Sequence, residues 1–233
     1  MEILSIIPAR GGSKGIKRKN VKMILNKPLI AYSIEASLKS KYITRTILSS
    51  EDSEILETGK KYGAETIVRP DELAQDVTKT APVMLHVLEE LEKQGYKADY
   101  VVLLQPTTPL RDEKYIDCAF DYYFEKLKEG YDSCFSAFDV GYTHAKWRIL
   151  HNNKLEGLYD YRLRPRRQEI EDHYKMICEN GAFYALPWDT LKEVKDFIGY
   201  NPCAYITPRV IDIDTEKDFE QVEKIIMERN KNA

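Results

Sequence analysis

Short apolar runs alternate with segments of helical periodicity over residues 1–138, and this alternation restricts the fold more than any other feature. The runs at residues 3–8 and 99–105 are apolar almost throughout. Such runs are typical of strands buried on both faces of a parallel sheet. Parallel strands that follow one another need helical crossovers on the faces of the sheet. The sequence therefore predicts a three-layer α/β sandwich around a mainly parallel, Rossmann-like sheet.

The expected elements follow from the same patterns. We expect strands at residues 3–8, 45–49, 65–68, 99–105, 132–138, 181–187 and 203–213, and helices at residues 29–40, 52–62, 80–94, 112–129 and 215–230. The alternation breaks over residues 141–178, which are rich in charged residues and tyrosine. We interpret residues 1–233 as a single domain and residues 141–178 as an arm inserted into it.

Composition and charge exclude several classes of function. The chain has 35 Lys and Arg against 38 Asp and Glu, a net charge of −3, so bulk attraction to nucleic acid is not expected. No apolar run approaches the roughly 18 residues of a membrane helix, and the first residues lack a secretory signal pattern. The four cysteines form no CxxC pair and the four histidines no HExxH, so neither a disulfide framework nor a zinc site is indicated. We expect a cytoplasmic protein with neither nucleic-acid nor membrane partners.

A basic, glycine-containing loop follows the first expected strand. Residues 9–20 read ARGGSKGIKRKN, with five cations in residues 10–20. Glycines let backbone N–H groups approach a phosphate, which the cations neutralise. The spacing is neither that of a P-loop nor that of a dinucleotide fingerprint, because Arg10 stands where the first glycine of that fingerprint would be. The loop suits a triphosphate, and the alternative is a solvated basic turn.

Two aspartates near the end of the chain form a second chemical feature. Asp212 and Asp214 occupy alternate positions at the end of the expected strand 203–213, and such side chains point the same way. Two carboxylates together with substrate phosphates suit Mg²⁺, and phosphoryl transfer needs such charges beside a cation-rich loop. The alternative is that Asp214 or Thr215 caps the last helix and that Asp212 is a surface acid.

Two further motifs combine turns with polar side chains. Residues 104–111, LQPTTPLR, follow the central strand, and Gln105 offers donors and an acceptor to hydroxyl-rich ligands. Residues 164–168, RPRRQ, precede ENGAFY at residues 179–184, and arginines suit carboxylates or phosphates. The alternatives are a stiff turn in the first case and a solvated or nucleic-acid-binding arm in the second.

Taken in order, IIPARGGSKGIKRKN, LLQPTTPLR, RPRRQ with ENGAFY, and IDIDTE cover essentially the whole chain. In these motifs the sequence resembles the acylneuraminate cytidylyltransferase family, the CMP–sialic acid synthetases. RPRRQ with ENGxFY is similar to the subgroup of animal sialic acid and bacterial legionaminic acid enzymes. The resemblance implies a nucleotide-diphospho-sugar transferase fold. It also implies Mg²⁺-dependent transfer of CMP from CTP to the anomeric hydroxyl of a nine-carbon 2-keto-3-deoxy sugar acid, with release of pyrophosphate.

The resemblance also implies site residues and a homodimer whose arm, residues 141–178, crosses to the neighbouring subunit. The implied nucleotide-binding residues are Ala9, Arg10, Gly11, Gly12, Ser13, Lys19, Asn20, Arg69, Asp76, Thr78 and Thr80. The implied sugar-binding residues are Gln105, Lys146, Arg166, Gln168, Glu179, Asn180 and Tyr184, and the implied Mg²⁺ ligands are Asp212 and Asp214. The implied catalytic residues are Arg10, Lys19, Arg166, Asp212 and Asp214. Lys19 would stabilise the α-phosphate, and Arg166 would bind the sugar carboxylate of the neighbouring subunit.

Other functions remain as alternatives. The basic loop suits phosphates and not a base, so an enzyme of this fold that uses GTP is open. A non-catalytic sugar-nucleotide binding protein has no need of both Lys19 and the aspartate pair, and a Rossmann oxidoreductase needs the missing glycine. Glu179 stands where some bacterial sialic acid enzymes have arginine, so the sugar stays open between N-acetylneuraminic, legionaminic, deaminated and pseudaminic acids.

Overall fold

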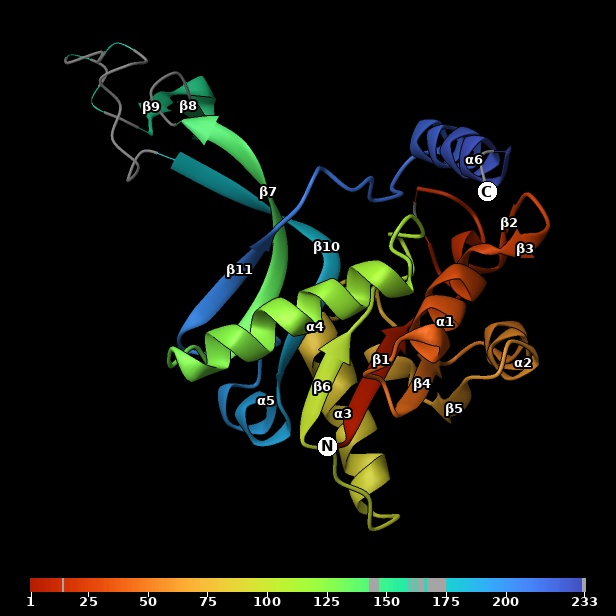
Figure 1. Cartoon of the computed structure of the whole chain (residues 1–233). Coiled ribbons are helices and arrows are strands. Elements are labelled where there is room, and N and C mark those ends of the chain that lie inside the picture. The colour runs from red at the N-terminus through yellow and green to blue at the C-terminus, as the bar shows by residue number, and fades with distance from the viewer. Residues whose placement is uncertain are drawn as a thin grey trace.

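A seven-stranded sheet forms the centre of the computed structural model, which describes residues 1–13, 15–142, 147–158, 160, 162, 166 and 175–231. Its strands are β1 (Ile3–Pro8), β4 (Arg45–Ser50), β5 (Glu65–Val68), β6 (Tyr100–Leu103), β7 (Ser133–Tyr142), β10 (Lys175–Pro187) and β11 (Pro202–Ile206). Their order is β11-β7-β10-β6-β1-β4-β5 (Figure 1). Only β10 runs antiparallel to its neighbours β6 and β7. The predicted mainly parallel sheet is therefore confirmed.

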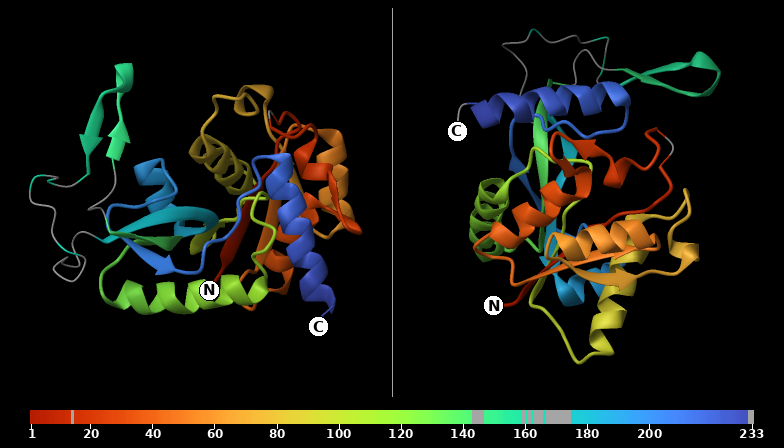
Figure 2. Two further views of the ribbon diagram at one scale, coloured as in Figure 1. Left: turned by 90° about the horizontal axis from the view of Figure 1, so that it is seen from above. Right: turned by 90° about the vertical axis from the view of Figure 1, so that its right-hand side faces the viewer.

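Helices cover both faces of this sheet. The α-helices of the described residues are α1 (Leu29–Lys39), α2 (Ser53–Lys61), α3 (Thr80–Glu92), α4 (Glu113–Lys128), α5 (Trp188–Val194) and α6 (Glu216–Lys231). Helices α1, α2 and α4 pack on one face, and α3 and α5 pack on the other (Figure 2). The sequence predicts all of these helices except the short α5. In the described part of the chain, no helix has the length and apolarity needed to span a membrane.

The central strand β1 is apolar at consecutive positions because both of its faces are covered by helices. Ile3 and Ile7 pack toward α1 and α4, whereas Leu4 and Ile6 pack toward α3 and α5. All four side chains are fully buried. Burying a side chain of this size contributes about 1.5–3 kcal/mol. The two helix layers are thus held to one strand by consecutive residues.

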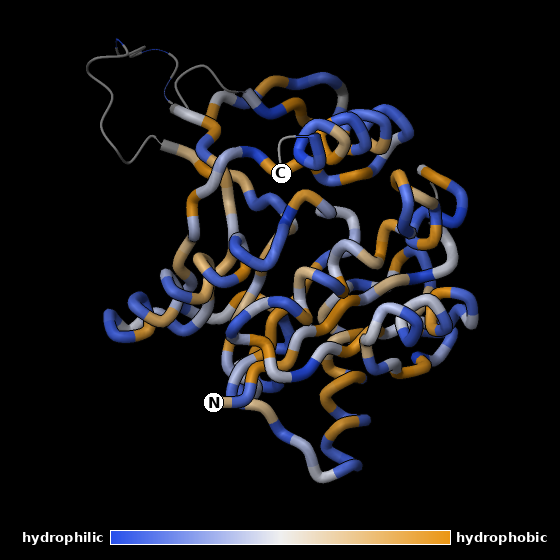
Figure 3. Tube along the Cα trace, turned by 45° about the vertical axis from the view of Figure 1, so that its right-hand side comes forward, coloured by the Kyte–Doolittle hydropathy of each residue, from blue (hydrophilic) through white to orange (hydrophobic). Residues whose placement is uncertain are grey.

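Helix α6 does not join either layer. Its buried residues Phe219, Val222 and Ile226 pack on Ile213 and on apolar residues of the first loop and its surroundings, namely Ile16, Ile24 and Leu29. The rest of α6 is largely hydrophilic (Figure 3). The helix begins with a capping box, in which Asp218 Oδ2 accepts from Thr215 N at 2.8 Å and Asp218 N donates to Thr215 Oγ1 at 3.3 Å. Residues near both ends of the chain therefore share one small core.

Strands β7 and β10 form a ribbon that continues beyond the sheet. Their pairing runs from Cys134–Ala185 within the sheet to Tyr142–Lys175 at the base of the predicted arm. The ends of residues 141–178 are thus strand residues, and the small hairpin β8 (Trp147–Ile149) and β9 (Leu155–Gly157) lies between them. The register of β10 against β7 shifts between Glu179 and Tyr184. This β-bulge re-aims the backbone of β10.

Strand β11 is shorter than predicted. It ends at Ile206 and does not reach residue 213. Thr207 N still donates to Ala137 O at 2.8 Å, but Pro208 has no N–H group to continue the ladder. The placement of Asp212 and Asp214 on a strand was therefore wrong. Both follow in an extended segment outside the sheet, where their exposed side chains alternate with the buried Ile213.

Candidate active site

Two adjoining cavities open at the carboxyl ends of β1 and β6, where ligands bind in open α/β sheets. The first has a volume of about 390 Å³ and the second about 820 Å³, both in the range of small-molecule sites. Gln105 and Asp214 line both cavities. A ligand in the first cavity can therefore meet a ligand in the second at these two residues.

Most of the predicted site residues in the described part of the chain line one cavity or the other, and their binding roles stay predictions. The first cavity is lined by Arg10, Ser13, Lys19, Asn20, Arg69, Asp76, Thr78 and Thr80, all predicted to bind the nucleotide. The second is lined by Glu179, Asn180 and Tyr184, predicted to bind the sugar, and by Asp212. Ala9, Gly11 and Gly12 line neither cavity.

Arg10 crosses from the first loop to the loop between β5 and α3. Its Nη1 donates to Asp76 Oδ1 at 2.6 Å, and its carbonyl oxygen accepts from Asn20 Nδ2 at 2.9 Å. Asn20 is buried, so its amide fixes the backbone of the loop from the protein interior. The Arg10 side chain keeps about 31% of its surface exposed. Its guanidinium is held in place and remains open to an anion in the cavity.

Gly11 is held by contacts within the protein. Its N–H donates to Glu51 Oε1 at 2.7 Å, and Glu51 Oε2 accepts from Arg69 Nε and Nη2 at 3.1 and 3.0 Å. A Cβ at Gly11 would lie 2.6 Å from Asp52 Oδ2. Burial lowers the pKa of Arg69, and the hydrogen-bonded Glu51 acts in the opposite direction. The N–H of Gly11 therefore secures the loop and already has a partner within the protein.

Lys19 joins the first loop to the segment that carries the aspartates. Its Nζ donates to Ile213 O at 2.5 Å and lies 3.6 Å from Asp214 Oδ1. The neighbouring Gly15 passes so close to this segment that a Cβ would lie 2.2 Å from Asp214 O. A side chain at this position would push the two segments apart. Glycine is thus required here for the close approach of two backbones.

Asp212 and Asp214 fit a divalent cation as a pair of carboxylates. Loss of hydration raises the pKa of Asp212; Thr107 lowers it through a hydrogen bond, and the Asp214 charge raises it further. Two like charges beside a phosphate site are the arrangement that Mg²⁺ neutralises, with its remaining ligands taken from phosphates and water. In the described ranges no group of three or more His, Cys, Asp or Glu side chains could hold a metal ion.

The bulge in β10 forms one wall of the second cavity. Asn180 Oδ1 accepts from Ser136 Oγ at 2.5 Å, and Asn180 Nδ2 donates to Thr207 Oγ1 at 3.0 Å. Gly181 adopts φ +73°, and a Cβ there would lie 3.0 Å from Gln105 Oε1. Asn180 is buried, so its amide stabilises the bulge, and the Gly181 backbone approaches the Gln105 side chain.

Arg111 is a residue whose role the sequence did not reveal. Its guanidinium is fully buried and donates from Nη1 to the carbonyl oxygens of Gln105 and Ala182, at 3.2 and 3.0 Å, and from Nη2 to Ser33 Oγ at 2.6 Å. Burial lowers the pKa of Arg111 to about 10. Within the described residues it forms no ion pair. Arg111 ties the turn of Gln105 to the bulge. Its place at the end of the rigid PTTPLR turn was the available signal.

Two further side chains define the second cavity. Tyr184 OH donates to Glu179 Oε2 at 3.0 Å, and burial raises the pKa of Tyr184, which keeps this phenol protonated. Arg209 also lines the cavity, and its guanidinium carbon lies 5.4 Å from the centroid of the Phe138 ring. Sequence reasoning missed Arg209 because it took residues 203–213 as one strand.

Comparison with known proteins decides the family. Residues 4–228 match the family described as cytidylyltransferase. The chain belongs to this family. The cytidylyltransferase is therefore a nucleotidyltransferase, and the resemblance inferred from its motifs is confirmed.

Several curated relatives are named for acidic sugars. The chain is 35% identical over 229 residues to a pseudaminic acid cytidylyltransferase from Campylobacter jejuni, with 94% of each chain covered. It is 32% identical over 236 residues to an N-acylneuraminate cytidylyltransferase from Escherichia coli, covering 99% of this chain and 53% of that protein. Among solved structures it is similar to a CMP–2-keto-3-deoxy-manno-octonic acid synthetase in complex with CTP. The TM-score is 0.73 at 16% identity, covering 98% of this chain and 100% of that one, which shows the shared fold.

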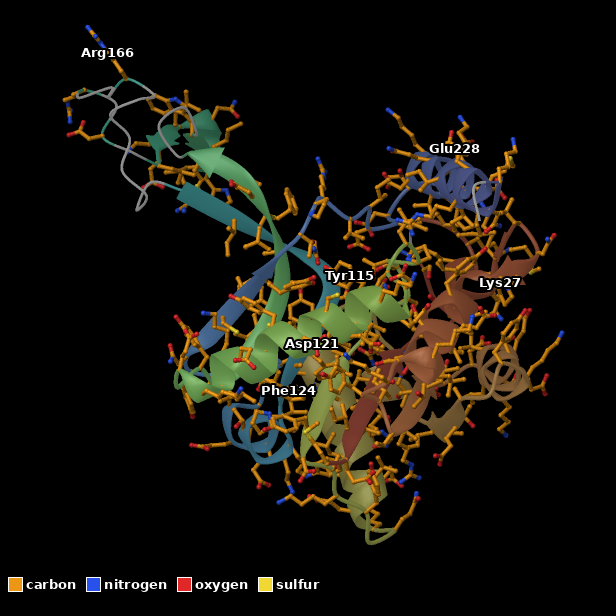
Figure 4. The ribbon with its side chains drawn as sticks, viewed as in Figure 1. Lys27, Tyr115, Asp121, Phe124, Arg166 and Glu228 are labelled. Carbon is orange, nitrogen blue, oxygen red and sulfur yellow. The ribbon has the colours of Figure 1, made fainter. Side chains whose placement is uncertain are left out.

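Of the arm residues predicted to reach the sugar, only Arg166 lies in the described part of this cytidylyltransferase. Arg166 lines neither cavity and lies on the arm, pointing away from the sheet (Figure 4). Lys146 and Gln168 lie outside the described residues. The role of these three residues therefore stays a prediction.

Proposed function

We propose that this cytidylyltransferase transfers CMP from CTP to the anomeric hydroxyl of a nonulosonic acid in a Mg²⁺-dependent reaction that releases pyrophosphate. The observation that carries the proposal is the meeting of two cavities at Gln105 and Asp214. The first is lined by cations of the basic loop, and the second by carboxylates and hydrogen-bonding groups. The relatives that act on pseudaminic and N-acylneuraminic acids support the choice of acceptor.

In the first cavity, the chain's own groups would hold the triphosphate. Arg10 and Lys19 would bind phosphate oxygens, with Lys19 at the junction where the α-phosphate must meet the acceptor. Fixed cations that face the charge developing in the transition state are among the largest contributions to phosphoryl-type transfer. Mg²⁺, when held by Asp212 and Asp214, would neutralise phosphate charge and polarise the reacting phosphorus.

In the second cavity, the acceptor sugar would be oriented toward the junction. Gln105 would bind its hydroxyl groups, since an amide both donates and accepts. The anomeric oxygen forms a bond to the α-phosphorus, the bond from this phosphorus to the bridging oxygen breaks, and pyrophosphate leaves. Asp212 would take the proton of the anomeric hydroxyl.

The arm supports the proposal of a homodimer. Its hairpin leaves Trp147, Ile149 and Leu155 exposed by 39%, 72% and 58%, and apolar surface of this kind is typical of a partner contact. In a dimer, Arg166 would reach the sugar of the neighbouring subunit. Light scattering should then give twice the chain mass of 27.1 kDa, and Arg166→Ala should raise KM for the sugar; a monomer would contradict this part of the proposal.

The test is pyrophosphate release over a grid of nucleotides and sugar acids. Wild-type protein with Mg²⁺ is incubated with CTP, GTP, ATP or UTP and with pseudaminic, N-acetylneuraminic or N,N′-diacetyllegionaminic acid. We expect release with CTP and one of the sugars, and none from Asp212→Ala with an unchanged circular dichroism spectrum. Release with GTP alone would overturn the assignment of cytosine as the base. No release from folded wild-type protein would overturn the proposed reaction.

A further inference from the structure

The charge of the second cavity does not match the proposed acceptor. Four carboxylates line it, those of Glu179, Asp212, Asp214 and Asp218. The acceptor is itself an anion, and like charges at such distances repel in a partly dehydrated site. Among the described residues that line the cavity, Arg209 is the one cation. An anionic sugar that enters this cavity therefore has one positive partner within the described part of the chain.

The lining carboxylates already have other partners. Glu179 accepts from Tyr184 OH, and Asp218 accepts from the N–H and hydroxyl groups of Thr215 at 2.8 and 2.7 Å. No ion pair joins Arg209 to any described residue. Its guanidinium keeps its donors available for a ligand in the cavity.

Phe138 fixes where this guanidinium lies. Arg209 stacks on the Phe138 ring at 5.4 Å, and both residues line the cavity. The segment is anchored just before Arg209, where Thr207 N donates to Ala137 O, next to Phe138. An aromatic face under a guanidinium leaves the N–H groups at its edge free to bind a carboxylate through two parallel hydrogen bonds.

We propose that Arg209 binds the carboxylate of the sugar acid and that Phe138 is the positioning residue that holds its guanidinium. The proposal rests on the function proposed above and adds a contact from the same subunit as the cavity. It is independent of the arm, because Arg209 reaches the cavity within one chain. Arg209 thereby selects for an acidic sugar over a neutral one.

Kinetics of single variants test this role. Pyrophosphate release is measured at saturating CTP while the sugar acid that wild type uses best in the grid is varied. Arg209→Ala should raise KM for the sugar about 10- to 100-fold, as expected for loss of a charge-assisted contact, with KM for CTP unchanged. Arg209→Lys should have a sugar KM between those of wild type and Arg209→Ala, because lysine keeps the positive charge but cannot form two parallel hydrogen bonds to a carboxylate. Lys217→Ala is the matched control: it removes a cation from α6 that does not line the cavity and should change neither constant.

Two further measurements identify the sugar group that Arg209 binds. The C1 methyl ester of the same sugar is used as a competitive inhibitor beside the free acid. Wild type should prefer the acid, and Arg209→Ala should lose most of this preference. Phe138→Leu should raise the sugar KM in the wild-type background and cause no further rise in the Arg209→Ala background, since coupled residues are non-additive.

Each result decides between the proposals. An unchanged sugar KM in Arg209→Ala, an equal rise in Lys217→Ala, or equal weakening of acid and ester would overturn the role of Arg209 and leave the transfer reaction standing. A wild-type protein inactive with every nucleotide and sugar would overturn the reaction, and this inference with it. Thermal melting of each variant distinguishes a lost contact from a lost fold.

Discussion

Lys19 Nζ lies 3.6 Å from Asp214 Oδ1, so a cation of the first loop and a carboxylate of the last loop meet where the two cavities join. The Lys19 side chain is only 13% exposed, whereas Asp214 is 77% exposed. The lysine is held by its hydrogen bond to Ile213 O, and the carboxylate remains free to face phosphates and a metal ion. This relationship sets the charge at the point where the new bond would form.

Lys19→Met should therefore abolish most turnover. Removing a fixed donor that faces a developing charge costs about 10²- to 10³-fold in kcat. The measurement is the rate of pyrophosphate release at saturating substrates, with circular dichroism to verify folding. Lys17→Met is the charge-matched control, because Lys17 is exposed and lines neither cavity. Equal rates for both variants would remove Lys19 from the reaction.

Gly15→Ala should destabilise the protein by about 1–3 kcal/mol, as overpacking does. Its Cβ would lie 2.2 Å from Asp214 O, so two backbones must separate. The matched control is Gly12→Ala in the same loop, where a Cβ meets nothing within 4 Å and the change should stay within about 0.5 kcal/mol. Urea denaturation of the two variants gives the comparison. If both lose the same stability, the close approach of the two segments is not what Gly15 provides.

Arg111→Met should lower the free energy of unfolding by about 2–4 kcal/mol, because buried acceptors lose their hydrogen-bond donor. The carbonyl oxygens of Gln105 and Ala182 would be left without this partner. Arg45→Met serves for comparison, since Arg45 pairs with the exposed Glu65 at the far edge of the sheet and should lose about 1 kcal/mol or less. Chemical unfolding measures both. Stability of Arg111→Met equal to that of Arg45→Met would contradict the bracing role.

The pair of Arg18 and Asp52 predicts a pH dependence of stability. The hydrogen-bonded Arg18 guanidinium lowers the pKa of Asp52 below its ordinary value of about 3.9. A carboxyl with a lowered pKa stabilises the fold above the unfolded-state pKa, and this contribution is lost as the pH falls through the folded-state pKa. Arg18→Met should thus be less stable than wild type at pH 7, by about 1 kcal/mol or less for a partly exposed pair. This difference in stability between wild type and Arg18→Met should disappear below about pH 4. Thermal melts from pH 7 to pH 3 measure it, and a gap that stays constant with pH would contradict the assignment.

The sequence was sufficient for the layered fold and for most residues of the first cavity. Strands β1 and β5 lie at the residues expected, because each carries its own local pattern. The end of β11 was missed because apolar alternation continues past Pro208, although the proline stops the ladder. The segment still presents Asp212 and Asp214 on the exposed side, so the alternation that the pattern indicated is present outside a strand, and their role as metal ligands stays a prediction.

Contacts between distant segments could not be predicted in this way. The bond from Gly11 to Glu51, the bond from Arg111 to Ala182 and the stacking of Arg209 on Phe138 each join different loops or strands. No local periodicity encodes such pairs. The bulge between Glu179 and Tyr184 is a shift of register, which depends on the partner strand β7 as much as on β10.

The shared core of α6 and the first loop has a consequence for how the enzyme comes into being. Ile16, Ile24 and Leu29 pack on Ile213, Phe219 and Val222, which are synthesised long after them. During synthesis, the sheet and its two helix layers can assemble while the basic loop still lacks its counterpart. The small core beneath the basic loop is therefore complete only when α6 has left the ribosome and docked. A chain that stops before residue 212 would keep the basic loop and lack the Asp212 and Asp214 carboxylates that line the second cavity.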